Sequence, residues 1–137
     1  MHIGTSPYGR VHSITVTDAS VHDSQVFDDL VHGEESVLYG DKGYADASQQ
    51  QRYEESGVTW RVSRKAKRNK KLNIADRSFN RKSNRVRARV EHAFGIVKHL
   101  WCYRKVRYKG IAKNAVQVFS LFALANFYQV RRELLAP

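Results

Sequence analysis

Residues 36–44, "SVLYGDKGY", place an aspartate between a short apolar run and a glycine turn. The apolar run predicts a strand over residues 36–41 that is buried on both faces, as parallel strands usually are. This strand ends on Asp41, whose carboxylate is costly to bury unless it is paired or binds a cation. Because open α/β sheets bind ligands at the carboxyl ends of their strands, Asp41 is a candidate site residue.

The segments around this strand predict an α/β domain. Residues 2–17 are expected to form a hairpin, because an alternating apolar and polar run follows a turn rich in Gly, Ser and Pro. The predicted elements alternate, with a strand, a helix, a strand, a helix and a strand followed by further helices. This order is typical of α/β folds. Helices are predicted over residues 18–33, 45–56, about 82–100 and about 113–134, and a further strand over 58–63.

Composition favours one folded domain over residues 1–137. A hydrophobic content of 42% argues against disorder. The single cysteine, Cys102, excludes an internal disulfide and a multi-thiolate metal site, and suits a reducing compartment. The longest apolar stretch, residues 115–128, is too short to span a bilayer, so no membrane partner is expected.

Positive charge is concentrated in one segment. Residues 61–89 contain 13 of the 24 Lys and Arg residues and only one of the 13 acidic residues, so they carry the whole net charge of +11. Such a segment favours a polyanion through counterion release, although a solvated basic face is the alternative. We expect residues 61–81 to form a basic loop between the last strand and the next helix. The candidate DNA contacts of this segment are Arg64, Lys65, Lys67, Arg68, Lys70, Lys71 and Arg85.

The helix predicted over residues 82–100 presents a second carboxylate. At about 100° per residue, its apolar residues form one stripe, and Arg87, Glu91 and Lys98 lie along the rim of that stripe. An Arg87–Glu91 ion pair at i, i+4 would contribute only a few tenths of a kcal/mol. Alternatively, Glu91 and Asp41 together could hold divalent metal ions against phosphates, as in phosphodiester chemistry.

Four stretches resemble one known family: "GRVHSITVTDASVHDS", "YGDKGY", "RVEHAFGIVK" and "YRKVRYKGIAKNAVQVFSLFALANFYQVRR". They are similar to the DDE transposases of bacterial insertion sequences, in the branch that contains the IS-five group. The family signature of Tyr, two residues, Arg, three residues, Glu, six residues and Lys falls on Asn84, Arg87, Glu91 and Lys98, with Asn84 in the place of Tyr. The resemblance implies an RNase H-like fold with a mixed five-stranded sheet.

The resemblance also implies a reaction and roles for the site residues. The reaction is the Mg²⁺-dependent cutting and joining of DNA at transposon ends, with Mn²⁺ as a substitute metal. Asp41 would be the second catalytic Asp and Glu91 the catalytic Glu, both metal ligands, while Arg87 and Lys98 would contact phosphates. DNA ends and target DNA are the implied partners, in the bacterial cytoplasm at the nucleoid.

One catalytic group of the family has no counterpart in the chain. The family's first catalytic Asp lies on the central strand, upstream of the hairpin, so this chain is expected to be the C-terminal part of the catalytic domain, lacking that strand. We therefore expect it to be catalytically incomplete and prone to associate, with a second copy or a full-length transposase as candidate partners. The alternatives are a non-enzymatic DNA-binding remnant, which could inhibit a full-length transposase, and a chain without function.

The remaining polar and aromatic candidates have ordinary structural interpretations. His22 and Asp23, in "VHDS", are expected to cap the first helix. Cys102 is expected to be a small core residue, and Trp60 and Trp101 are expected in the core. Aromatic and basic residues alternate over 103–110, which indicates either a DNA contact or an ordinary surface.

Overall fold

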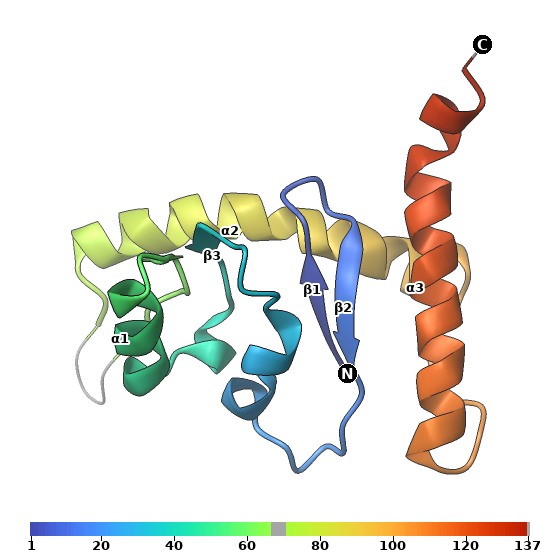
Figure 1. The fold of residues 1–137 in the computed structure, drawn as a ribbon, viewed down its shortest axis with the longest axis horizontal. Coiled ribbons are helices and arrows are strands. Elements are labelled where there is room, and N and C mark those ends of the chain that lie inside the picture. The colour runs from blue at the N-terminus through green and yellow to red at the C-terminus, as the bar shows by residue number, and fades with distance from the viewer. Residues whose placement is uncertain (67–70, 137) are drawn as a thin grey trace. The chain divides into compact units, whose positions relative to one another are not determined.

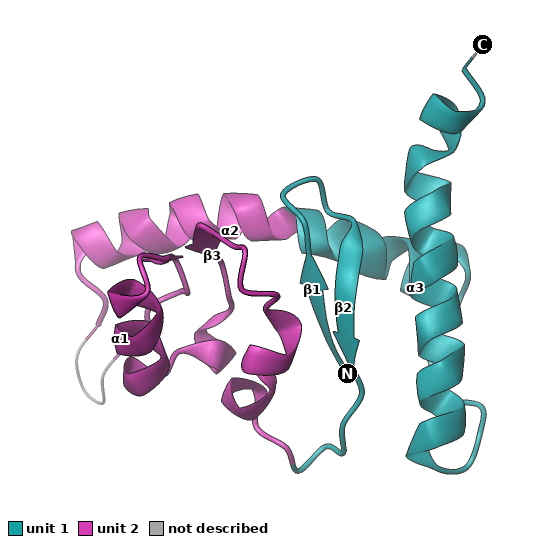
Figure 2. Cartoon of the chain, viewed as in Figure 1, with its two compact units in different colours: residues 1–20, 89–137 teal, residues 21–88 magenta. Residues whose placement is uncertain are grey.

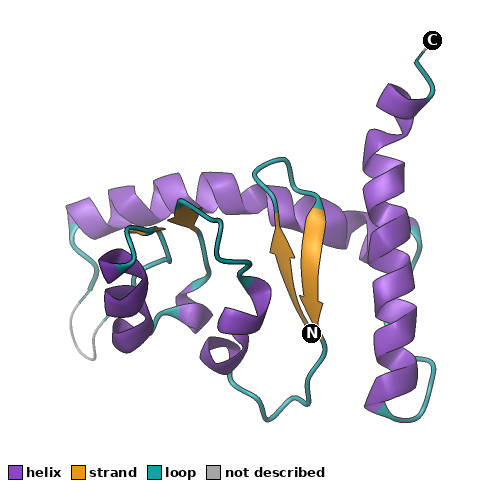
Figure 3. Cartoon of the chain, in the orientation of Figure 1, coloured by secondary structure: helices purple, strands orange, loops and turns teal. Residues whose placement is uncertain are grey.

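The computed structural model of the protein describes residues 1–66 and 71–136 (Figure 1). The chain divides into two compact units, residues 1–20 with 89–137 and residues 21–88 (Figure 2). We call these unit 1 and unit 2, and each is described by itself. Helices and strands occur in both units (Figure 3), so the predicted mixed α/β class is confirmed.

Unit 1 begins with the predicted hairpin. Strand β1 (His2–Thr5) pairs antiparallel with β2 (Val11–Thr15), with Ile3 opposite Ile14. Gly9 closes the turn with a φ of 80°, in the left-handed region that favours glycine. A Cβ on Gly9 would lie only 3.0 Å from the Arg89 carbonyl oxygen, so this turn also needs glycine for its close packing.

The long helix α3 (Ile111–Leu134) supplies half of the buried residues of the unit 1 core. Phe122 is almost fully buried and meets the edge of Phe94, with 5.6 Å between the ring centroids. The Asn126 carboxamide accepts from the Val11 amide at 2.8 Å and donates to the Val11 carbonyl at 2.7 Å, as a neighbouring strand would. The buried cluster consists of Val11, Ala93, Val97, Val118, Phe122 and Ala125.

Unit 2 contains the strand from which the sequence argument began. Strand β3 (Val37–Leu38) pairs parallel with β4 (Thr59–Trp60), and helix α1 (Ala47–Glu55) lies between them in sequence. Leu38 is buried but Val37 is 37% exposed, so the expectation of burial on both faces is wrong for Val37. The core of unit 2 consists of Phe27, Leu38, Trp60 and Val62.

The helix predicted over residues 18–33 is absent from the described chain. Residues Asp23–Val26 and Asp28–Leu30 form two short 3₁₀ turns instead. The His22 imidazole accepts from the Ser24 amide at 3.2 Å, so it caps the first 3₁₀ turn and not the predicted helix. Asp28 accepts from Arg52 and Tyr53 at 2.5 and 2.7 Å. Short polar side chains that bind locally or through tertiary contacts compete with an α-helix in this way.

Helix α2 (Ile74–Gly95) begins eight residues before the predicted start, so residues 74–81 are helical and not part of the basic loop. The Asn73 side chain accepts from the Asp76 amide at 2.6 Å and caps the helix. Arg and Lys are good helix formers. The positive charge of residues 74–81 was therefore a poor indicator of a loop. A π-helical turn, Ile96–Leu100, continues α2.

The strands of the described residues form two separate two-stranded sheets. Among the described helices, none has both the length and the apolar composition needed to cross a membrane. Trp60 is buried and Trp101 packs against the unit 1 core, as predicted. Cys102, however, is exposed with a φ of 55°, so its expected core position is wrong: it lies in the turn after the π-helical segment.

Candidate functional site

Asp41 lies at the carboxyl end of β3, as the sequence predicted. The parallel pairing continues past β3 through a hydrogen bond of 3.0 Å from the Ser63 amide to the Gly40 carbonyl. Asp41 then begins a 3₁₀ turn, Lys42–Tyr44, but its side chain makes no capping hydrogen bond to that turn. The Asp41 side chain is 49% exposed, so solvent reaches its carboxylate.

Arg87 on α2 reaches this carboxylate. Arg87 Nη2 lies 3.4 Å from Asp41 Oδ2, and its side chain is only 24% exposed. Arg87 Nη1 donates to Asn84 Oδ1 at 3.1 Å, and the Ser63 hydroxyl donates to the same oxygen at 3.2 Å. Asn84 therefore orients the guanidinium. Ser63, Asn84, Arg87 and Asp41 form a network that ties α2 to the strand end.

The glycine turn beside Asp41 accommodates a second carboxylate. The Asp23 carboxylate lies so close to Gly43 that a Cβ at that position would overlap its Oδ2. The pKa of Tyr44 is raised to about 12, mainly by burial and also by the charges of Asp23 and Asp41, while Arg87 opposes this shift. Asp23 therefore belongs to the surroundings of Asp41, which the helix-capping interpretation missed. The glycine in "DKGY" was the available signal, because it marks a close approach.

Glu91 and Lys98 belong to unit 1, whose position relative to unit 2 is not determined. Glu91 is exposed on α2, and Lys98 is exposed on the π-helical turn. The Lys98 ammonium lies 4.7 Å from the centroid of the Phe94 ring, a cation–π contact that holds its long side chain over the aromatic face.

Carboxylate oxygens such as those of Asp41 and Glu91 suit Mg²⁺. Within the described residues, however, no group of three or more His, Cys, Asp or Glu side chains is arranged to hold a metal ion.

Arg64, in the basic segment of residues 61–89, is held in place by residues of α2. Arg64 Nη1 lies 2.5 Å from Asp76 Oδ1, and the guanidinium lies 4.3 Å from the centroid of Phe79. The Asn80 side chain also bonds the backbone amide and carbonyl of Arg64. The charge of Arg64 is therefore partly offset by Asp76. Lys65, Lys71 and Arg85 are exposed, and Lys67, Arg68 and Lys70 lie outside the described residues.

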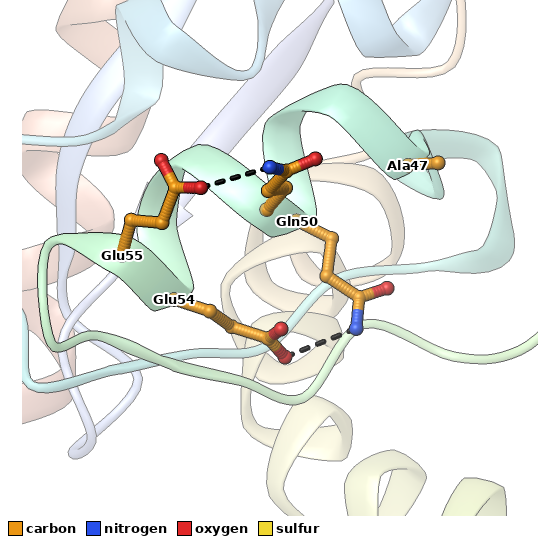
Figure 4. Close-up of a pocket in the computed structure, with 5 residues that line it drawn as sticks. Ala47, Gln50, Glu54 and Glu55 are labelled. Atoms are coloured by element: carbon orange, nitrogen blue, oxygen red, sulfur yellow. Dashed lines mark hydrogen bonds between the residues drawn. The ribbon is translucent and has the colours of Figure 1, made fainter.

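A shallow depression on α1 is chemically separate from this network (Figure 4). Gln50 donates to Glu54 at 3.0 Å and Gln51 donates to Glu55 at 2.8 Å. These i, i+4 bonds satisfy the carboxylates along the helix surface, so the depression offers no convergent catalytic groups.

The comparison with known families agrees with the resemblance seen in the sequence. A family model described as "Transposase DDE domain" matches residues 1–127. No solved structure matches the chain. The chain belongs to the transposase DDE domain family.

Proposed function

We propose that this chain is part of a DNA transposase of a bacterial insertion sequence, in the IS-five branch. Family membership implies transposition and DNA as the partner. The proposed activity of the whole enzyme is Mg²⁺-dependent cleavage and strand transfer at the ends of the element. Residues 1–137 would form the C-terminal part of its RNase H-like catalytic domain, in the cytoplasm and associated with the nucleoid.

The ion pair between Asp41 and Arg87 is the observation that carries this proposal. It brings a strand-end carboxylate to a helix whose next turn holds Glu91. A guanidinium beside a carboxylate is suited to bind a phosphate oxygen of DNA next to the reacting group. Asp41 and Glu91 would be the metal ligands of the site, and Arg87 and Lys98 its phosphate contacts.

The strand pairing supports an RNase H-like origin. Removing the central strand from such a five-stranded mixed sheet leaves one antiparallel pair and one parallel pair of strands. The described residues contain one pair of each kind. In the family that strand carries the first catalytic Asp. Residues 1–137 contain no counterpart of that Asp, so we propose that these residues are catalytically incomplete by themselves and act together with further protein, either a second copy or a full-length transposase.

A nicking assay tests the catalytic part of the proposal. Supercoiled DNA is incubated with Mn²⁺ and the wild type, Asp41→Asn or Glu91→Gln, with Asp29→Asn as the control because it makes the same change at an exposed residue of unit 2. We expect DNA binding without nicking in all four proteins. Nicking by the wild type and the control that disappears in the two site variants would show a complete site and contradict the proposed incompleteness.

A non-enzymatic DNA-binding remnant is the second candidate, and the basic segment favours it. This role needs only phosphate contacts, which make binding salt-dependent and insensitive to sequence. The ratio of affinities for an element end and for unrelated DNA of equal length distinguishes the two roles. A ratio near one supports the remnant, whereas a marked preference for the element end supports a transposase.

The same segment gives a sharper binding test. Removing one phosphate contact should reduce the slope of log K against log salt by about one. We expect this reduction for Arg85→Ala, and a smaller one for Arg64→Ala because Asp76 already pairs with Arg64. Equal slopes for Arg85→Ala and the wild type would remove Arg85 from the DNA contact.

A further inference from the structure

Helix α3 is apolar on two opposite faces. One face enters the unit 1 core through Val118, Phe122 and Ala125, and residues of the hairpin and of the end of α2 pack against this cluster. At about 100° per residue, the opposite direction is occupied by a second row of side chains. We call this row the outer stripe; it consists of Val116, Phe119, Ala123, Phe127, Val130 and Leu134.

The outer stripe is uncharged and, apart from the half-buried Val130, exposed. Val116, Phe119, Phe127 and Leu134 are between 45% and 65% exposed. No charged residue occurs in the sequence from 114 to 130. A surface helix normally carries polar residues on the face that points away from the core, so this pattern indicates a protein contact on the second face.

We propose that the outer stripe pairs with the same stripe of a second copy, with the two helices antiparallel about a twofold axis at Ala123. In this register Phe119 faces Phe127 of the other copy, and Val116 faces Val130. The small side chain of Ala123 lets the helices approach to the usual 8–10 Å, and the flanking rings form aromatic pairs. The stripe is thus complementary to itself, as a twofold interface requires.

The helix dipoles favour the antiparallel arrangement over the parallel one. Antiparallel helices place the negative C-terminal end of one α3 beside the positive N-terminal end of the other. The charged side chains of the last turn do not decide between the arrangements: Arg131 and Glu133 lie on opposite rims of the outer stripe, and Arg132 lies on the side of the helix opposite to Ala123.

The exposed area is large enough for a dimer. The four large apolar side chains of the outer stripe, Val116, Phe119, Phe127 and Leu134, retain 45–65% of their surface, which amounts to about 500 Å² per copy if a free large side chain offers roughly 200 Å². Two copies would therefore bury about 1,000 Å², the minimum for a specific interface. This dimer does not depend on the proposed transposase activity.

Sedimentation velocity over a range of concentrations, at high salt and after nuclease treatment, tests the proposal. We expect the mass of two copies for the wild type and at least about thirtyfold weaker association for Phe127→Glu, which places charge at the centre of the contact. Val106→Glu is the matched control, since Val106 is an exposed apolar residue of the same unit, outside α3; it should dimerise as the wild type does. A folded wild-type monomer at all concentrations, or a dimer that Phe127→Glu leaves intact, would overturn the proposal.

Disulfide trapping tests the register with changes too small to unfold the helix. In a Cys102→Ser background, Ala123→Cys should cross-link to itself under oxidation. Val116→Cys should not, because antiparallel pairing separates the two copies of residue 116 by about 21 Å along the helix axis. Cross-linking at residue 116 but not at 123 would overturn the antiparallel arrangement.

Discussion

Gly43→Ala is the most informative single change in unit 2. The site for its Cβ is occupied by the Asp23 carboxylate, and the three nearest atoms all belong to Asp23. The φ of Gly43 lies outside the positive range that L side chains avoid, so alanine is acceptable to the backbone. The effect of the substitution therefore reports on the packing of one identified side chain.

Two effects of opposite sign determine how Gly43→Ala changes the free energy of unfolding. Replacing glycine by alanine at a compatible position stabilises a protein by about 0.4–1 kcal/mol, because the unfolded chain loses freedom. Forcing a methyl group into an occupied site costs about 1–3 kcal/mol in a packed core, and the lower end applies here because Asp23 is half-buried and its carboxylate can move. We therefore expect Gly43→Ala to lower the free energy of unfolding by about 0.5 kcal/mol. In an Asp23→Ala background the obstacle is gone, and the same change should raise it by about 0.4–1 kcal/mol.

A double-mutant cycle by urea unfolding, followed by circular dichroism, measures this reversal of sign. Gly95→Ala is the control, because no atom lies within 4 Å of its Cβ site and the residue is helical; it should stabilise by about 0.5–1 kcal/mol. Additive effects of Gly43→Ala and Asp23→Ala, or a stabilising Gly43→Ala in the wild type, would refute the close approach.

Three further predictions concern the cores and the titration of the site. Phe122→Ala should cost about 3–5 kcal/mol, measured by urea unfolding, because a nearly fully buried ring leaves a cavity beside Phe94. Asn114→Ala should cost about 1–3 kcal/mol and speed amide exchange at Tyr108, because the buried Asn114 carboxamide bonds the Tyr108 amide and carbonyl and the Gly110 carbonyl. The pKa of Tyr44 rises from 10 to about 12 on folding. Its contribution to the free energy of unfolding is therefore complete below pH 10 and is lost as the pH rises toward 12. The wild type should therefore lose about 1 kcal/mol more than Tyr44→Phe across that interval in pH-dependent unfolding, a figure reduced for partial exposure.

Elements with a strong local signal were predicted well. The hairpin, α1 and α3 follow from alternation, caps and helical periodicity, and the structure confirms all three. The start of α2 and the two 3₁₀ turns were missed. In both cases side-chain hydrogen bonds decided the boundary: Asn73 caps α2, and Asp28 is held by Arg52. Such choices depend on geometry that periodicity does not contain.

The sequence by itself determined the mixed α/β class, the position of the positive charge, the family and the placement of Asp41 at a strand end. These features depend on residue order over short stretches, where side-chain periodicity and turn chemistry act directly. Only the tertiary structure decided that Arg87 pairs with Asp41, that Asp23 lies against Gly43, and that one apolar face of α3 stays uncovered. Partner choice and burial arise between segments far apart in the chain, and a local pattern cannot specify which of several available partners will be near enough to bind.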